Sequence, residues 1–148
     1  MKDANHTVAD WLQPLTHLLT FSPLIQPLNA SADVAWLSTG HRYINGNKPW
    51  KLFGHLQLLP QKPPALLSFG GPHSNHLHAL AACGQLLNVP TIGVVRGYAE
   101  CALTPALQDC QGFGMKLEFV DRVTYRRRHD DEFIEALAQQ WQAVVVPE

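Results

Sequence analysis

Two short segments carry the residue types that could do chemistry in this chain. Lys48 lies in the segment 46–52, between a glycine turn and an apolar stretch. Further along the chain, the segment 70–76 follows a predicted strand and combines two glycines with Ser74 and Asn75. A lysine amine can form a Schiff base with an aldehyde cofactor. A glycine turn at a helix start can hold an anionic group, so the pair predicts half of a cofactor site.

Each segment also has an ordinary explanation when it is taken alone. Lys48 reads as a solvated lysine at a helix start, where the macrodipole penalty is only about 0.3–1 kcal/mol. Ser74 and Asn75 are common helix-start residues, and simple capping is an equal alternative to anion binding. Gly70 and Gly71 favour a ligand, because two adjacent glycines permit close approach of the backbone.

Other chemistries fit this region less well. A serine hydrolase requires Gly-x-Ser-x-Gly, whereas the order around Ser74 is Gly-Pro-His-Ser-Asn. A metal site is also disfavoured: His76 and His78 point apart on a helix that begins near Ser74, and no cysteine or carboxylate completes a ligand set with His73. We expect these histidines to be exposed or to lie in loops.

Three further features have structural interpretations. The segment 112–114 lacks the third glycine of a dinucleotide fingerprint and is predicted to be a turn. The basic run 126–129 precedes two aspartates and favours a solvated face, with a phosphate contact left open. Cys83 falls on an apolar helical stretch and is predicted to be a core residue.

The elements that must position these residues follow a regular pattern. Strands are predicted at 65–69, 91–95, 116–120 and 143–146, and helices at 74–87, 104–110 and 130–141. Short apolar strands that alternate with amphipathic helices predict an α/β fold, with an open, mainly parallel sheet and helices on both faces. Ligands of such sheets bind beyond the carboxyl ends of the strands, where the segment 70–76 follows its strand.

The region before residue 65 is less regular. The pattern indicates an amphipathic segment at 8–19 and a short strand at 34–37, and the prolines of the intervening stretch argue against a long helix. Pro49 has the fixed φ of a first helical residue, so we expect a helix from Pro49 to about Leu59 with Lys48 at its entrance.

Composition limits the function class. The 148 residues suffice for one ordinary domain, and a net charge of −1 with 46% hydrophobic residues gives no preference for nucleic acid or a membrane. The three cysteines are an odd number without a Cys-x-x-Cys pair, so neither a disulfide framework nor a zinc ribbon is indicated. No signal peptide or transmembrane run is seen, and we expect a cytoplasmic protein that acts on small molecules.

With these motifs in view, the sequence resembles the 1-aminocyclopropane-1-carboxylate deaminase and D-cysteine desulfhydrase family of pyridoxal-phosphate enzymes, which has the tryptophan synthase β-like fold. The resemblance covers most of the chain. Its most specific parts are GNKPWKL at 46–52 and LLSFGGPHSNHLHALAA at 66–82, and supporting similarity extends through 19–23, 26–28, 91–97, 114–117, 125–130 and 146–148.

The resemblance implies roles for four residues. Lys48 would bind pyridoxal 5'-phosphate as an imine and later move protons at the substrate carbons, with Ser74 as a second catalytic residue. Asn75 would hydrogen-bond the ring oxygen of the cofactor, while Ser74, Asn75 and His76 would receive the substrate carboxylate. The implied reaction releases ammonia and a keto acid from a small amino acid such as D-cysteine or 1-aminocyclopropane-1-carboxylate, and the family implies a homodimer without a metal.

The sequence departs from the family in three places. Acidic positions upstream of the lysine are lost in the segment 36–43, and Pro49 and Trp50 replace an aromatic residue and a basic or aromatic one. The chain also stops at Glu148, before the phosphate-binding loop of the family. We therefore expect residues 1–47 to be the N-terminal part of the larger cofactor-binding domain and 48–148 the small α/β domain, with the remainder absent. The alternative to the enzyme is a truncated, inactive remnant or a non-enzymatic α/β module.

Overall fold

The computed structural model describes residues 9–19, 24–29, 32–36, 39, 41–100 and 102–148. Within them, one sheet has two strands and the other has four. The four-stranded sheet has the order β5-β4-β3-β6, and all its neighbouring strands are parallel. Its strands are β3 (Leu66–Gly70), β4 (Thr91–Arg96), β5 (Lys116–Val120) and β6 (Val144–Val145).

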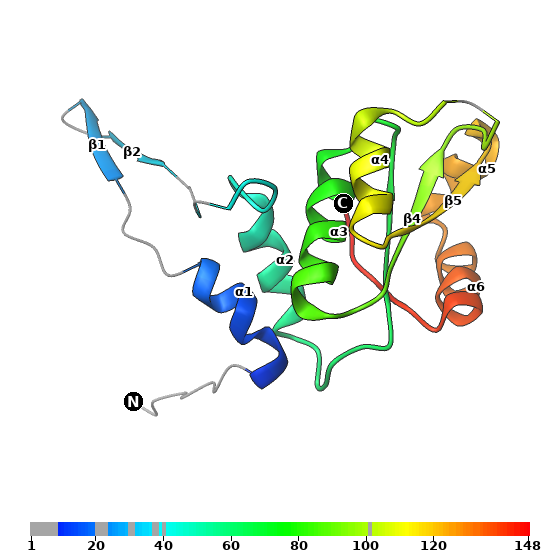
Figure 1. Ribbon diagram of the computed structural model, residues 1–148, viewed down its shortest axis with the longest axis horizontal. Coiled ribbons are helices and arrows are strands. Elements are labelled where there is room, and N and C mark those ends of the chain that lie inside the picture. The colour runs from blue at the N-terminus through cyan, green and yellow to red at the C-terminus, as the bar shows by residue number, and fades with distance from the viewer. Residues whose placement is uncertain (1–8, 20–23, 30–31, 37–38, 40, 101) are drawn as a thin grey trace.

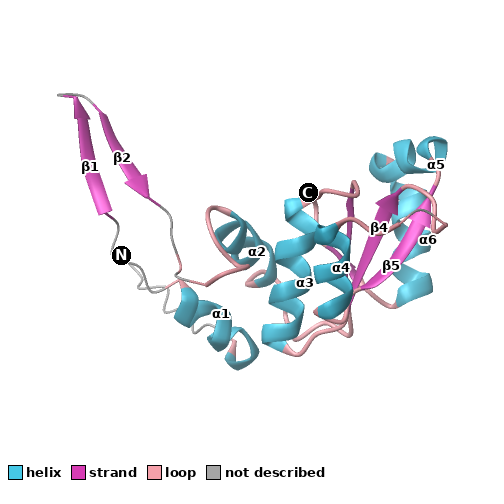
Figure 2. Cartoon of the chain, turned by 45° about the horizontal axis from the view of Figure 1, so that its top comes forward, coloured by secondary structure: helices cyan, strands magenta, loops and turns pink. Residues whose placement is uncertain are grey.

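The sheet is parallel and apolar because helices cover both of its faces. All five residues of β3 are buried, as are the first five of β4. The helices that follow β3, β4 and β5 in the chain are α3 (Asn75–Leu87), α4 (Pro105–Gly112), α5 (Arg122–Arg126) and α6 (Asp131–Trp141). Figures 1 and 2 show α3 and α4 on one face and α5 and α6 on the other. The predicted fold class is confirmed.

Side-chain caps define where these helices start. Ser74, Thr104, Asp121 and Asp130 precede α3, α4, α5 and α6, and each accepts a hydrogen bond from a backbone N–H of the first turn. The helix α5 and the short 3-10 helix η2 (Arg127–His129) that continues it were not predicted from the sequence. The basic run 126–129 is therefore mostly helical.

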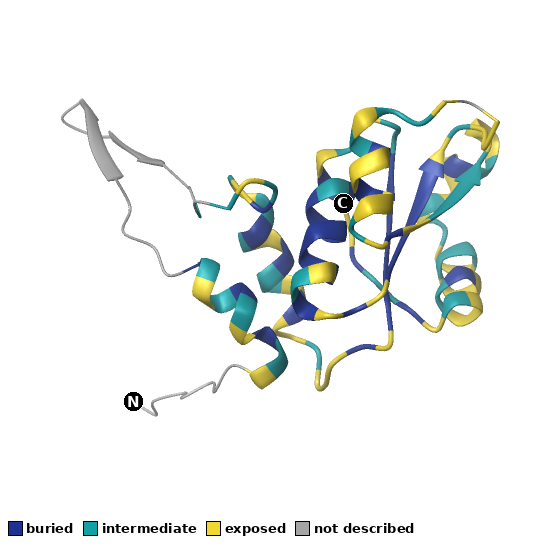
Figure 3. Cartoon of the chain, in the orientation of Figure 1, coloured by how far each residue is buried: buried dark blue, intermediate teal, exposed yellow. Residues whose placement is uncertain are grey.

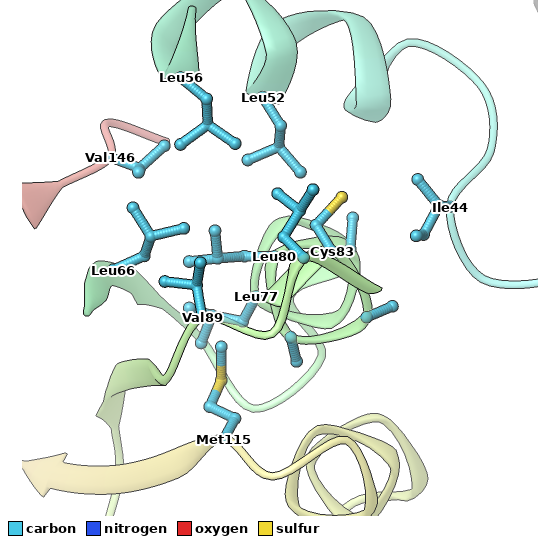
Figure 4. Packing of buried hydrophobic residues seen from close by; sticks show 14 of the residues in the cluster. Ile44, Leu52, Leu56, Leu66, Leu77, Leu80, Cys83, Val89, Met115 and Val146 are labelled. Atoms are coloured by element: carbon cyan, nitrogen blue, oxygen red, sulfur yellow. The ribbon is translucent and has the colours of Figure 1, made fainter. Parts of the chain in front are cut away.

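The core lies on both sides of the sheet, and the larger cluster is built around α3 (Figures 3 and 4). Leu77, Leu80 and Cys83 face the sheet and the helix α2 (Lys48–Leu56). From α2, Leu52 and Leu56 pack into the same cluster. The core position predicted for Cys83 is confirmed, and burial raises the pKa of its thiol to about 12.

The N-terminal region contributes to this core as well. The 3-10 helix η1 (Asp10–Leu12) and the helix α1 (Gln13–Leu18) place Leu12 and Leu15 in the cluster around α3. The two-stranded sheet pairs β1 (Leu24–Asn29) with β2 (Ala32–Trp36) in antiparallel order, and Figure 1 shows it apart from the main layer. The domain boundary expected after residue 47 stays a prediction.

Most element boundaries agree with the sequence prediction to within two residues. The helix expected to reach about Leu59 ends at Leu56, and turns follow it. The strand expected at 34–37 begins earlier, at Ala32, and residue 37 lies outside the described residues. The 112–114 turn begins inside α4, and Gly114 has a φ of 86° that favours glycine.

Candidate functional site

The local backbone explains how Lys48 is placed. Gly46 has a φ of 64°, a left-handed conformation that glycine adopts without strain, and it turns the chain into α2. Pro49 is buried in the first turn of that helix. Lys48 is the first helical residue, and its Nζ donates to Asn47 Oδ1 at 3.3 Å. The lysine therefore lies at the helix entrance, as predicted.

The loop after β3 places the second group of predicted residues. Gly70 is buried against the start of α3, where a Cβ atom would lie 2.7 Å from Leu77 and from Ser74 Cβ. The glycine thus lets the chain turn tightly from β3 into α3. Asn75, the first residue of α3, is exposed.

Lys48 and Asn75 line one cleft of about 370 Å³, although they come from different helices and are 27 positions apart in the numbering. The other lining residues are Arg42, Tyr43, Asn45, Asn47, His78 and Ala79. The lining holds two basic side chains and three amides, and it contains no carboxylate. This composition suits an anionic ligand with hydrogen-bond acceptors.

Aromatic packing builds one wall of the cleft. Tyr43 makes edge contacts with His78 and Phe113, with ring centroids 5.6 and 4.9 Å apart. The Arg42 guanidinium lies 5.1 Å from the centre of the Tyr43 ring. His78 Nε2 is 3.1 Å from Asp109 Oδ2, an interaction that holds its ring from the other side. The sequence did not indicate a role for Tyr43, and the expectation of an exposed or loop position is wrong for His78, which is half-buried within α3.

Ser74 has a structural role in this arrangement. Its hydroxyl accepts a hydrogen bond from the Leu77 N–H at 3.2 Å, and Ser74 is not among the residues that line the cleft. The structure therefore shows the capping alternative and brings Lys48 to Asn75 rather than to Ser74. The catalytic and substrate-binding roles of Ser74 stay predictions.

The cap predicts a measurable stability contribution. Replacing Ser74 with alanine should lower the free energy of unfolding by about 1 kcal/mol, because the N–H at the start of α3 loses its acceptor. Urea unfolding of the wild-type chain and the variant measures this difference. Ser74→Asp retains a capping oxygen and should restore most of the loss. Equal stability of Ser74→Ala and the wild type would contradict the capping role.

His76 differs from the expectation of an exposed or loop histidine, which is wrong for this residue. Its side chain is buried, with a relative exposure of 5%, and Nε2 lies 2.9 Å from Ser68 Oγ. The Ser68 hydroxyl donates to the Val146 carbonyl at 2.6 Å, so it accepts from the His76 N–H. Ser68 is a polar residue in an apolar strand, and a buried hydroxyl there needs partners. This was the signal in the sequence for the interaction.

Electrostatics keep His76 neutral. Burial is the main cause that lowers the pKa of His76 from 6.5 to about 4, and the positive charges of Lys48, Lys51 and His55 lower it further. The imidazole ring belongs to the interior and does not line the cleft. The predicted contact of His76 with a substrate carboxylate stays a prediction.

The described part of the chain contains neither a candidate metal site nor a helix that could span a membrane. No group of three or more His, Cys, Asp or Glu side chains there could hold a metal ion. None of the helices in the same residues combines the length and apolar character that a bilayer crossing requires.

Comparison with known proteins gives one structural likeness. No family model and no curated protein matches the chain. Among the solved structures that match is a threonine deaminase from T.th., with 22% sequence identity and a TM-score of 0.45. The match covers 66% of this chain and 28% of that one, so the chain spans little more than a quarter of the neighbour's length. A likeness at this level does not assign the chain to a family.

Proposed function

We propose that the cleft beside Lys48 binds pyridoxal 5'-phosphate covalently through the Lys48 amine. The observation that carries this proposal is that Lys48 and Asn75 line one cleft with Arg42 and without a carboxylate. A volume of about 370 Å³ lies within the range of small-molecule and cofactor sites, roughly 300–1,000 Å³. The donor set also fits the cofactor, which brings an aldehyde, a ring oxygen and an anionic phosphate.

Different residues of the cleft would bind different parts of pyridoxal 5'-phosphate. The Lys48 amine is the nucleophile that can attach an aldehyde. The Asn75 amide can donate to the ring oxygen, and the Arg42 guanidinium offers charge-assisted donors to an anion. When bound, the cofactor supplies an electron sink for bond cleavage beside the amino group of a substrate.

We further propose that the ligand processed there is a small amino acid and that the reaction is a deamination or desulfhydration. The first N–H groups of α3 have no partner within the helix, and they lie next to Asn75. They suit the carboxylate of such a substrate. Lys48 would then move a proton between substrate carbons, because its amine belongs to the lining of the same cleft.

Lys48→Ala tests the proposal directly. Incubation with pyridoxal 5'-phosphate followed by borohydride reduction should label Lys48 in the wild-type chain, and the alanine variant should lose that label because the amine is gone. Peptide mass spectrometry locates the label, and visible absorbance after dialysis measures retention. Lys51→Ala is the matched control, since Lys51 is exposed on the same helix and does not line the cleft.

The possible results separate cofactor binding from catalysis. Equal labelling of the wild type, Lys48→Ala and Lys51→Ala would overturn the cofactor site. Retained cofactor with ammonia release from D-cysteine or 1-aminocyclopropane-1-carboxylate supports the enzyme. Retained cofactor without ammonia release from either amino acid would overturn the proposed deamination or desulfhydration. The result would then support the alternative of a non-enzymatic α/β module that binds the cofactor.

A further inference from the structure

A second cleft, of about 380 Å³, lies at the carboxyl ends of β4 and β5. It is lined by Arg96, Gly97, Tyr98 and Arg122. Arg96 is the last residue of β4, and Arg122 begins α5, which follows the end of β5. Ligands of parallel α/β sheets bind at this edge, so the cleft has a favourable position in the fold.

The cleft is cationic without a compensating acid in its lining. Arg96 and Arg122 form no ion pair with any carboxylate of the described residues. Asp121, the neighbour of Arg122, accepts from the backbone N–H groups of Val123 and Thr124 at 2.7 and 2.8 Å. A cleft lined by charges of one sign concentrates its field and attracts the opposite charge.

One of the two guanidiniums also contacts an aromatic ring. The Arg96 guanidinium lies 5.8 Å from the centre of the Tyr125 ring, and that of Arg128 lies 5.1 Å from the same ring. Arg128 lines a separate cleft that also contains Glu148. Arg96 and Arg122 are thus the cationic pair of this cleft, and the Arg96 guanidinium contacts the Tyr125 ring.

An apolar pocket of about 150 Å³ adjoins the cationic cleft and shares Arg96, Gly97 and Tyr98 with it. Its other lining residues are Pro72, Ala102, Leu103, Thr104, Leu107 and Phe119. The Thr104 hydroxyl donates to the Pro72 carbonyl and caps α4, which ties this wall to the loop after β3. The two neighbouring spaces therefore differ in chemistry: one is cationic and the other is apolar.

We propose that these joined clefts form a second ligand site for a small organic anion that carries an apolar group. The anionic group would lie between Arg96 and Arg122, and the apolar group would enter the pocket beside Leu103 and Phe119. Two guanidiniums suit a doubly charged phosphate better than a singly charged carboxylate, because each can donate two parallel hydrogen bonds. This site uses none of the residues of the Lys48 cleft and is independent of the proposed function.

Titration with phenyl phosphate, followed by calorimetry and by the amide NMR signals of Gly97 and Tyr98, tests the site. Phenyl phosphate should bind more tightly than benzoate, and both inorganic phosphate and phenol should bind more weakly because each lacks one half of the ligand. Arg122→Gln should weaken phenyl phosphate binding about tenfold through loss of charge-assisted hydrogen bonds. Arg126→Gln, on the same helix but outside both clefts, should leave it unchanged.

Two results would overturn the site. One is phenyl phosphate binding that Arg122→Gln and Arg126→Gln weaken equally, which indicates general attraction to a basic surface. The other is the absence of binding at millimolar phenyl phosphate while circular dichroism shows the wild-type fold intact. Lys48→Ala should leave the response of the Gly97 and Tyr98 amide signals to phenyl phosphate unchanged, so failure of this site is distinguishable from failure of the proposed cofactor site.

Discussion

Replacing His76 with glutamine should remove a pH-dependent change in stability of about 3 kcal/mol. The effect is large because the ring is buried, while Lys48, Lys51 and His55 add positive charge nearby. Together these surroundings lower the pKa of His76 from 6.5 to about 4. A glutamine amide can still donate to the Ser68 hydroxyl, but it does not titrate.

The sign follows from proton uptake on unfolding. Below pH 6.5 the unfolded chain protonates His76, whereas the folded chain keeps it neutral until about pH 4. Unfolding therefore takes up a proton in this window, and the free energy of unfolding decreases as the pH falls from about 6.5 to about 4, by about 1.4 kcal/mol per pH unit. Below about pH 4 both the folded and the unfolded chain carry a protonated His76, so His76 causes no further change in the free energy of unfolding.

Urea unfolding at several pH values between 7 and 4 measures the slope. The part of this slope that His76 causes is the difference between the slopes of the wild type and of His76→Gln. His73→Gln is the matched control, because His73 is exposed in the loop before α3. If the wild-type and His76→Gln curves run parallel over this range, the buried neutral histidine is refuted, whatever their offset at pH 7.

The α/β layer was predictable because its local and tertiary signals agree. The strands that form β3 and β4 are short apolar runs, and the structure buries them on both faces. The helix after β3 begins after a serine that caps it, and its apolar residues lie against the sheet. Each signal selects the same element type, so elements of ordinary length needed no tertiary information.

The missed elements lack such agreement. The helix α5 has five residues and begins at Arg122, so it is too short for a periodic pattern and its charge suggested a solvated segment. The strand β1 contains Pro27, which removes a backbone donor and argues against a strand. In the structure β1 nevertheless pairs with β2 in antiparallel order, with Pro27 opposite Asp33 and a register shift between Pro27 and Asn29.

The candidate site was only partly predictable for a related reason. The order of the elements along the chain placed Lys48 and Asn75 at two helix starts, and the structure brings them to one cleft. The wall formed by Tyr43 and His78 depends on packing against Phe113. Phe113 is distant from both residues in the sequence, so the sequence pattern does not indicate this contact. For the same reason, the sequence did not show that the ring of His76 turns into the core.

Gly70→Ala should lower the free energy of unfolding by about 1–3 kcal/mol, because the added Cβ overpacks the junction between β3 and α3. That atom would lie 2.7 Å from the side chain of Leu77 and from Ser74 Cβ. Leu77 is fully buried, and Ser74 is the cap of α3. We therefore expect relief of the contact to displace the start of α3, where Asn75 lines the cleft.

Gly71→Ala is the matched control, because its Cβ would meet only Arg96 Nη2 at 3.9 Å, an ordinary contact. We expect its stability to stay within about 0.5 kcal/mol of the wild type. Urea unfolding measures the free energy of unfolding of both variants. The yield of Lys48 labelling by pyridoxal 5'-phosphate, measured without urea while each variant is folded, reports whether the cleft is intact. A loss of labelling in Gly70→Ala alone ties the cleft to the position of α3. Equal stability of the two variants would show that this junction yields to an added methyl group, and the tight packing inferred for Gly70 would be wrong.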